Sequence, residues 1–137
     1  MPDDAFPDRV SIQRPVLVVV LENGPNVVGT LAIVDSGADS CIFPASLAGP
    51  LGIAIPNRNR SVFSGTTDSP QIAYFENVRA RIWDSTTKSF VFDFGLYAGF
   101  CDTLEHVGHG LLGQNGFFSR FVVKFDGAES LFDIELK

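Results

Sequence analysis

The stretch that decides the fold is AIVDSGADSCIFP, residues 32–44. Three apolar residues lead directly into Asp35, a Ser-Gly pair follows, and a second acid, Asp39, lies four residues beyond the first. A strand that ends on a carboxylate and enters a tight turn holds that carboxylate on rigid backbone near the interior. Gly37 lets other backbone approach closely and leaves its own N–H free to bond a carboxylate oxygen. This placement suits an acid whose ionisation must be controlled, although Asp-Ser-Gly also forms ordinary turns between strands.

Turn-forming residues punctuate the rest of the chain and separate short strand-like segments. Asparagine, glycine and proline at residues 23–26 predict a hairpin between two aliphatic, β-branched runs. Glycine, serine and proline at residues 65–70 predict a second hairpin tip, and Asp126-Gly127 a third. The predicted strands are residues 16–21, 27–34, 41–44, 61–64, 71–83, 90–97, 121–125 and 131–136.

Helical periodicity is scarce. The best candidate is residues 114–120, which follow Gly113 and predict one short helix near the C-terminus. In the segment 90–97, alternation predicts that Phe90, Phe92 and Phe94 lie on one face of their strand. The pattern as a whole predicts a mostly β domain with pairing between segments distant in the sequence.

Length and composition exclude several classes of protein. A chain of 137 residues is most economically one domain, and 45% hydrophobic residues are enough for a packed core. A net charge of −6 gives no basic surface for phosphates, so neither nucleic acid nor an anionic membrane is an expected partner. The longest wholly apolar run, residues 16–21, is far shorter than the roughly 20 residues that cross a bilayer.

The N-terminus and the cysteines bear on location. Residues 1–10 are acidic and have no apolar core, so they do not read as a secretory signal. The two cysteines make a disulfide framework improbable, so we expect a reducing, cytoplasmic compartment. We expect residues 1–13 to form an N-terminal arm, either flexible or at a dimer interface, and residues 14–137 to form the domain.

One group of residues suggests a metal-site hypothesis. Cys101, His106 and His109 are ligand types that zinc accepts. A fourth ligand would have to come from distant Cys41 or an acid, and glycines at positions 108 and 110 indicate a loop. We therefore favour an ordinary loop and expect neither a metal nor another cofactor.

A second stretch, GLLGQNGFFSRF at residues 110–121, gives the turn at Asp35 a family context. It is an apolar pair closed by glycine and followed by a short helical segment, a strand and a final hairpin. With the first strand pair and the hairpin around Gly65, this order resembles the retropepsin-like (retroviral-type) aspartic proteases. The resemblance covers nearly the whole chain, from residue 14 to about residue 136, and is most specific at residues 32–39 and 111–118.

The resemblance implies a closed or folded β-sheet barrel with a flap hairpin, and an aspartic endopeptidase that is active as a homodimer on peptide or protein substrates. Each subunit would contribute one catalytic aspartate to a shared site, where the pair activates a water. The implied assignments are as follows: Asp35, Ser36 and Gly37 catalytic; Ala38 and Asp39 in the substrate groove; Ser64, Gly65 and Thr66 in the flap; Leu112 and Gly113 as the apolar support behind the catalytic turn.

The chain departs from the family pattern in several ways. Viral members favour threonine at the position of Ser36, and Gln114 stands where the family commonly has an arginine that pairs with the acid at Asp39. The flap has one glycine, Gly65, and residues 98–109 form an insertion longer than in small viral enzymes. These differences leave open an alternative function, a catalytically weak or inactive peptide-binding or scaffold module that keeps the fold.

Overall fold

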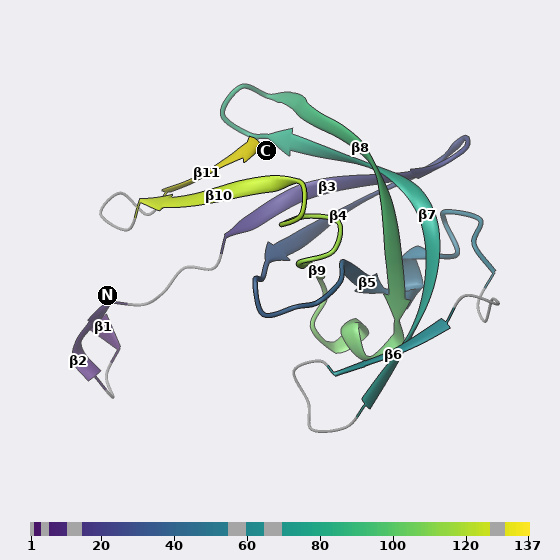
Figure 1. Ribbon diagram of the computed structural model, residues 1–137, viewed down its shortest axis with the longest axis horizontal. Helices are drawn as coiled ribbons and strands as arrows, with labels where there is room; N and C mark the ends of the chain where they lie inside the picture. Colours follow the sequence, from purple (N-terminus) through teal and green to yellow (C-terminus); the bar gives the residue numbers. More distant parts are fainter. Residues whose placement is uncertain (1, 4–5, 11–14, 55–59, 65–69, 127–130) are drawn as a thin grey trace.

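The computed structural model describes residues 2–3, 6–10, 15–54, 60–64, 70–126 and 131–137. Six strands pair in a ring and close a β-barrel (Figure 1). In their order around the barrel they are β3 (Val16–Asn23), β4 (Asn26–Val34), β9 (Gly110–Leu112), β5 (Ile42–Pro44), β8 (Ser89–Cys101) and β7 (Pro70–Asp84), which pairs again with β3. The expectation of a mostly β, barrel-like fold is confirmed.

Three strand pairs extend or accompany the barrel. β6 (Arg60–Ser64) pairs with the first part of β7, as expected for a hairpin around residues 65–69. β10 (Phe121–Asp126) and β11 (Leu131–Leu136) form the predicted last hairpin, and β1 (Pro2–Asp3) pairs with β2 (Phe6–Val10).

Hairpins between neighbouring strands follow the alternation of the sequence. β3 and β4 pair antiparallel from Val16↔Ile33 to Asn23↔Asn26. On β3, Val19 and Leu21 point into the core, with 1% and 0% of their surface exposed. Because side chains alternate between the faces of a strand, this single register buries one face and leaves the other outside.

Two parallel pairings then connect segments distant in the sequence. β4 lies beside β9, with Val34 opposite Leu112, and β5 lies beside β8, with Ile42 opposite Gly99. β5 also meets β9 at the pair Ile42↔Leu111. These pairings bring the stretch that follows β4 against the stretch that follows β9.

Phenylalanine side chains fill much of the core. Phe121 is 1% exposed, and its ring centroid lies 4.8 Å from that of Phe92, 5.2 Å from that of Phe94 and 5.0 Å from that of Phe117. Edge-on and tilted aromatic pairs at these separations add to the gain from burial. The segment between β9 and β10 is thereby packed onto β8.

The predicted helix at residues 114–120 is wrong. These residues form successive turns, in which the N–H groups of Phe117 and Phe118 both donate to the carbonyl of Gly113. Gly116 has a φ of 110°, a left-handed conformation that a regular α-helix does not contain. The helical spacing of apolar residues reflects a tightly wound segment that buries Phe117 and Phe121, without helical backbone.

The predicted common face of Phe90, Phe92 and Phe94 is also wrong. Phe92 pairs with Ile82 and Phe90 with Trp83, so the register shifts by one residue between these two pairs. The bulge places Phe90 against Trp83, with ring centroids 5.0 Å apart, and leaves it 41% exposed. A bulge reverses the face on which the following side chains lie, and alternation alone does not reveal it.

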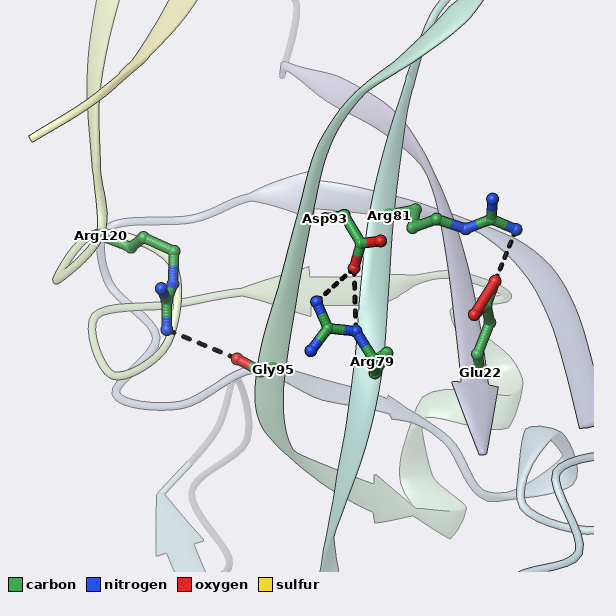
Figure 2. Close-up of polar contacts among 6 residues, drawn as sticks. All are labelled: Glu22, Arg79, Arg81, Asp93, Gly95 and Arg120. Atoms are coloured by element: carbon green, nitrogen blue, oxygen red, sulfur yellow. Dashed lines mark hydrogen bonds and ion pairs between the residues drawn. The ribbon is translucent and has the colours of Figure 1, made fainter. Parts of the chain in front are cut away.

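Polar contacts join the strands on the outside of the barrel (Figure 2). Arg79 pairs with Asp93 at 2.6 Å between β7 and β8, and Arg81 pairs with Glu22 at 2.5 Å between β7 and β3. The Arg79–Asp93 pair is exposed and contributes about 1 kcal/mol or less, whereas the Arg81–Glu22 pair is partly buried. The Arg120 guanidinium also donates to the carbonyl of Gly95 at 3.5 Å, which ties the end of the turn segment to β8.

Among the residues that the structure describes, the helical segments are two 3-10 turns, η1 (Ala45–Leu47) and η2 (Asp102–His106). They are linked by the N–H of Ser46, which donates to a carboxylate oxygen of Glu105 at 2.6 Å. Within the described residues, no helix combines the length and apolar character needed to traverse a bilayer.

Candidate active site

Asp35 is the first residue after β4, and backbone hydrogen bonds fix its position. The N–H of Val34 donates to the carbonyl of Pro15 at 2.9 Å, and the N–H of Asp35 donates to the carbonyl of Leu112 at 3.0 Å. The strand thus remains attached to its neighbours up to the residue that carries the carboxylate. Asp35 is half-buried, whereas Ser36 and Gly37 are exposed.

The turn after Asp35 folds back onto its carboxylate. The N–H of Gly37 donates to Oδ1 of Asp35 at 2.9 Å, and the N–H of Ala38 donates to the backbone carbonyl of Asp35 at 3.1 Å. This is the hydrogen bond that the sequence predicts for Gly37. A hydrogen bond to an ionised carboxylate is stronger than one between neutral groups, so it holds the side chain in one orientation.

Residues 113–115 brace the turn from behind. The N–H of Gln114 donates to the carbonyl of Ala38 at 2.8 Å, and the N–H of Asn115 donates to the carbonyl of Asp39 at 2.9 Å. The Gln114 side chain adds a third bond, from Nε2 to the carbonyl of Ser36 at 2.7 Å. The turn is therefore held at three of its carbonyl groups by two consecutive residues.

Gly113 permits this close approach. A Cβ atom at its position would lie 2.5 Å from the carbonyl oxygens of both Ala38 and Ser40, which is shorter than any ordinary contact. Only a residue without a side chain fits between the two segments. Leu112 and Gly113 therefore contact the turn in two ways. The Leu112 carbonyl accepts a hydrogen bond from the N–H of Asp35, and Gly113 leaves room for the carbonyls of Ala38 and Ser40.

The structure brings together most, not all, of the residues that the resemblance singles out. Asp35, Ser36, Gly37, Ala38 and Asp39 form one turn, which lies directly against Leu112 and Gly113.

The assigned flap residues are placed only in part. Ser64 ends β6 and pairs with Pro70 at the start of β7. Gly65 and Thr66 lie outside the described residues. Their assignment to a flap stays a prediction.

The sequence interpretation missed the role of Gln114. The family pattern has an arginine at this position that pairs with the acid at Asp39, and glutamine cannot form that salt bridge because it carries no charge. In the structure its amide binds the Ser36 carbonyl instead, and Asp39 is an exposed residue joined to the brace by its backbone. The position of Gln114 in the sequence could have indicated this role, since a long side chain with an N–H donor directly follows Gly113, which contacts the turn.

Cys41 lies behind the same turn as a buried thiol. It has no exposed surface, and Sγ donates to the carbonyl of Asn115 at 3.6 Å. Burial raises the pKa of the Cys41 thiol from 9.0 to about 11, and the main chain of Gly113 opposes this only in part. The thiol is a packed apolar group that resists ionisation.

This thiol predicts a pH dependence of stability. Between about pH 9 and pH 11 the unfolded chain loses the Cys41 proton while the folded chain keeps it, so the free energy of unfolding falls as the pH rises. A pKa raised from 9.0 to about 11 lowers the free energy of unfolding by about 2 kcal/mol at pH 11. Urea unfolding from pH 8 to pH 11 should therefore show a smaller decline for Cys41→Ala than for the wild type. Equal declines would contradict the assignment.

Cys101 and His109, two residues of the metal-site hypothesis, have other neighbours in the structure. Cys101 is buried, with Sγ 2.9 Å from Oγ1 of Thr103, and Nδ1 of His109 lies 3.0 Å from the carbonyl oxygen of Gly110. In the part of the chain that the structure describes, no three histidine, cysteine or acidic residues are grouped as metal ligands.

The site is thus one half-buried carboxylate on a rigid strand end, oriented by Gly37 and braced by residues 112–115. Such an arrangement can hold a proton donor or acceptor in a fixed position, and it presents one carboxylate per chain. No family model matches the sequence, and no curated protein matches it significantly.

Proposed function

We propose that this chain is the subunit of a homodimeric aspartic endopeptidase of the retropepsin-like type. The observation that carries the proposal is the fixed position of Asp35, whose backbone is bound to β9 and whose carboxylate is bound by Gly37. A carboxylate held in this way is ready for proton transfer without further ordering.

Symmetry supplies the second carboxylate. The sequence contains Asp-Ser-Gly once, so a catalytic pair requires two copies of the chain related by a two-fold axis. Two carboxylates about 3 Å apart cannot both ionise, so they share one proton, as the paired aspartates of aspartic proteases do.

The proposed reaction is hydrolysis of a peptide bond by a bound water. The ionised carboxylate takes a proton from the water, whose oxygen attacks the carbonyl carbon, while the protonated carboxyl donates its proton to the carbonyl oxygen. Collapse of the tetrahedral intermediate breaks the C–N bond and passes a proton to the leaving amine. No cofactor enters these steps.

The neighbouring residues take the roles that the resemblance implies. Ser36 bonds across the dimer axis, Gly37 offers backbone to the substrate, and Ala38 and Asp39 line the groove. The resemblance assigns residues 64–66 to a flap over the substrate, and of these the structure describes Ser64 alone. The exposure of Ser36 and Gly37 is compatible with contacts to a second chain and to a substrate.

The alternative, a binding module without turnover, draws on the absence of the family arginine at position 114. The hydrogen bond from Gln114 to the Ser36 carbonyl weakens this alternative, because the turn keeps a side-chain brace. A module that only binds peptides has no need of a carboxylate oriented so firmly.

Purified protein is expected to cleave peptides from a diverse library between pH 4 and pH 8, with a preference for bulky apolar residues beside the cut bond. An aspartic-protease transition-state mimic should block the cleavage, because it occupies the place of the tetrahedral intermediate between the two carboxylates. Mass spectrometry of the products, with and without the inhibitor, measures both results. Peptide binding without any cleavage across this pH range would establish the binding module instead.

A further inference from the structure

One peptide group in the turn is held at both of its polar ends. The carbonyl of Ser36 accepts a hydrogen bond from Nε2 of Gln114 at 2.7 Å. The N–H of the same peptide group, which belongs to Gly37, donates to Oδ1 of Asp35 at 2.9 Å. A continuous chain of hydrogen bonds therefore runs from the amide of Gln114 through a single peptide plane to the carboxylate.

The Ser36–Gly37 peptide group couples the directions of these two hydrogen bonds. The peptide group is planar, so fixing its carbonyl oxygen also fixes the direction of its N–H. A hydrogen bond accepted by the carbonyl polarises the group and makes the N–H a stronger donor. The Gln114 side chain thus acts on Asp35 without touching it.

The other contacts of the brace do not depend on the side chain at position 114. The N–H groups of Gln114 and Asn115 bind the carbonyls of Ala38 and Asp39 through backbone atoms, which every substitution except proline retains. Gln114 is exposed, so its replacement leaves no cavity in the core. The effect of the side chain can therefore be separated from the integrity of the fold.

We propose that Gln114 is a positioning residue for the catalytic carboxylate, acting through the Ser36–Gly37 peptide group. This inference rests on the proposed peptidase function for its catalytic consequence. Its structural part, the coupling of Gln114 to the Gly37 N–H, stands independently of any activity.

Three variants separate hydrogen-bond donation from size. Gln114→Met has a side chain of similar length without a hydrogen-bond donor. Gln114→Glu has the same shape, but its ionised carboxylate has only acceptors, which repel the Ser36 carbonyl. Gln114→Lys keeps a donor. Asn77→Asp is the matched control, since Asn77 is an amide on β7 outside the turn and its brace.

We expect kcat to fall about tenfold in Gln114→Met and Gln114→Glu, the size of one lost hydrogen bond to a positioned group, with KM nearly unchanged. Gln114→Lys should recover most of the loss, and Asn77→Asp should behave as the wild type. Unchanged kcat in the Met and Glu variants would overturn the positioning role.

The amide proton of Gly37, observed by NMR on the intact protein, tests the coupling without any substrate. We expect its resonance to move upfield in Gln114→Met, where its bond to Asp35 weakens, to return towards the wild-type position in Gln114→Lys and to stay in place in Asn77→Asp. A resonance that does not move in folded Gln114→Met overturns the inference, whatever the kinetics. If the wild type cleaves no peptide while this resonance responds as expected, the coupling stands and the peptidase proposal fails.

Discussion

Asp35→Asn is expected to lower kcat/KM for peptide cleavage by at least about a thousandfold, in the range found when a general acid or base is removed. An amide neither accepts the proton of the attacking water nor donates one to the carbonyl oxygen. Asparagine keeps a side-chain oxygen at the position of Oδ1, so the bond from Gly37 and the turn itself should survive. Cleavage of the best library peptide measures the loss, and sedimentation shows whether the dimer persists.

The matched control for this variant is Asp93→Asn. Asp93 lies on the outside of β8, paired with Arg79, and is exposed, so the same chemical change there should leave cleavage intact (Figure 2). If Asp35→Asn cleaves as well as the wild type, Asp35 is not the catalytic acid. If both variants lose activity while remaining folded, the effect does not belong to the turn.

Gly113→Ala is expected to lower the free energy of unfolding by about 3 kcal/mol or more, at the upper end of the cost of inserting one methyl group into a packed site. The new Cβ atom would lie 2.5 Å from the carbonyl oxygens of Ala38 and Ser40. The Ala38 carbonyl cannot retreat without losing its bond from the N–H of Gln114. The turn would move away from its brace, so activity should fall together with stability.

Gly29→Ala provides the matched comparison on the neighbouring strand. A Cβ atom at Gly29 in β4 meets nothing within 4 Å, so this variant should change stability by about 0.5 kcal/mol or less. Urea unfolding of both variants, followed by circular dichroism, measures the difference. Equal stability of Gly113→Ala and Gly29→Ala would mean that the contact between the turn and its brace is looser than described.

The local elements of this fold could be predicted because alternation and turn residues act over short distances. The pairs β3–β4 and β10–β11 follow directly from apolar runs on either side of turn-forming residues. The register shift beside Phe90 could not be predicted in this way, because a bulge changes no residue type in the pattern. The turns at residues 114–120 kept a helical spacing because they bury Phe117 and Phe121 in the same core.

The position of Asp35 at a strand end that enters a tight turn was predictable, and the residues that support the turn were less so. The order of a strand, an acid and a glycine indicated Asp35 and Gly37. The bond between Gln114 and Ser36 joins residues 78 positions apart, and it depends on the parallel pairing of β4 with β9. A pairing of that kind is set by packing in the closed barrel, which no local pattern records.

A subunit-mixing experiment tests most directly whether the two copies of Asp35 act together. Wild-type and Asp35→Asn chains are mixed at constant total concentration, allowed to exchange subunits, and assayed for peptide cleavage. If each active site needs both carboxylates, an equal mixture retains about one quarter of the wild-type activity, because random pairing leaves that share of dimers with two aspartates. Retention of about one half, in proportion to the wild-type chains, would show that each chain works alone and would contradict the shared site.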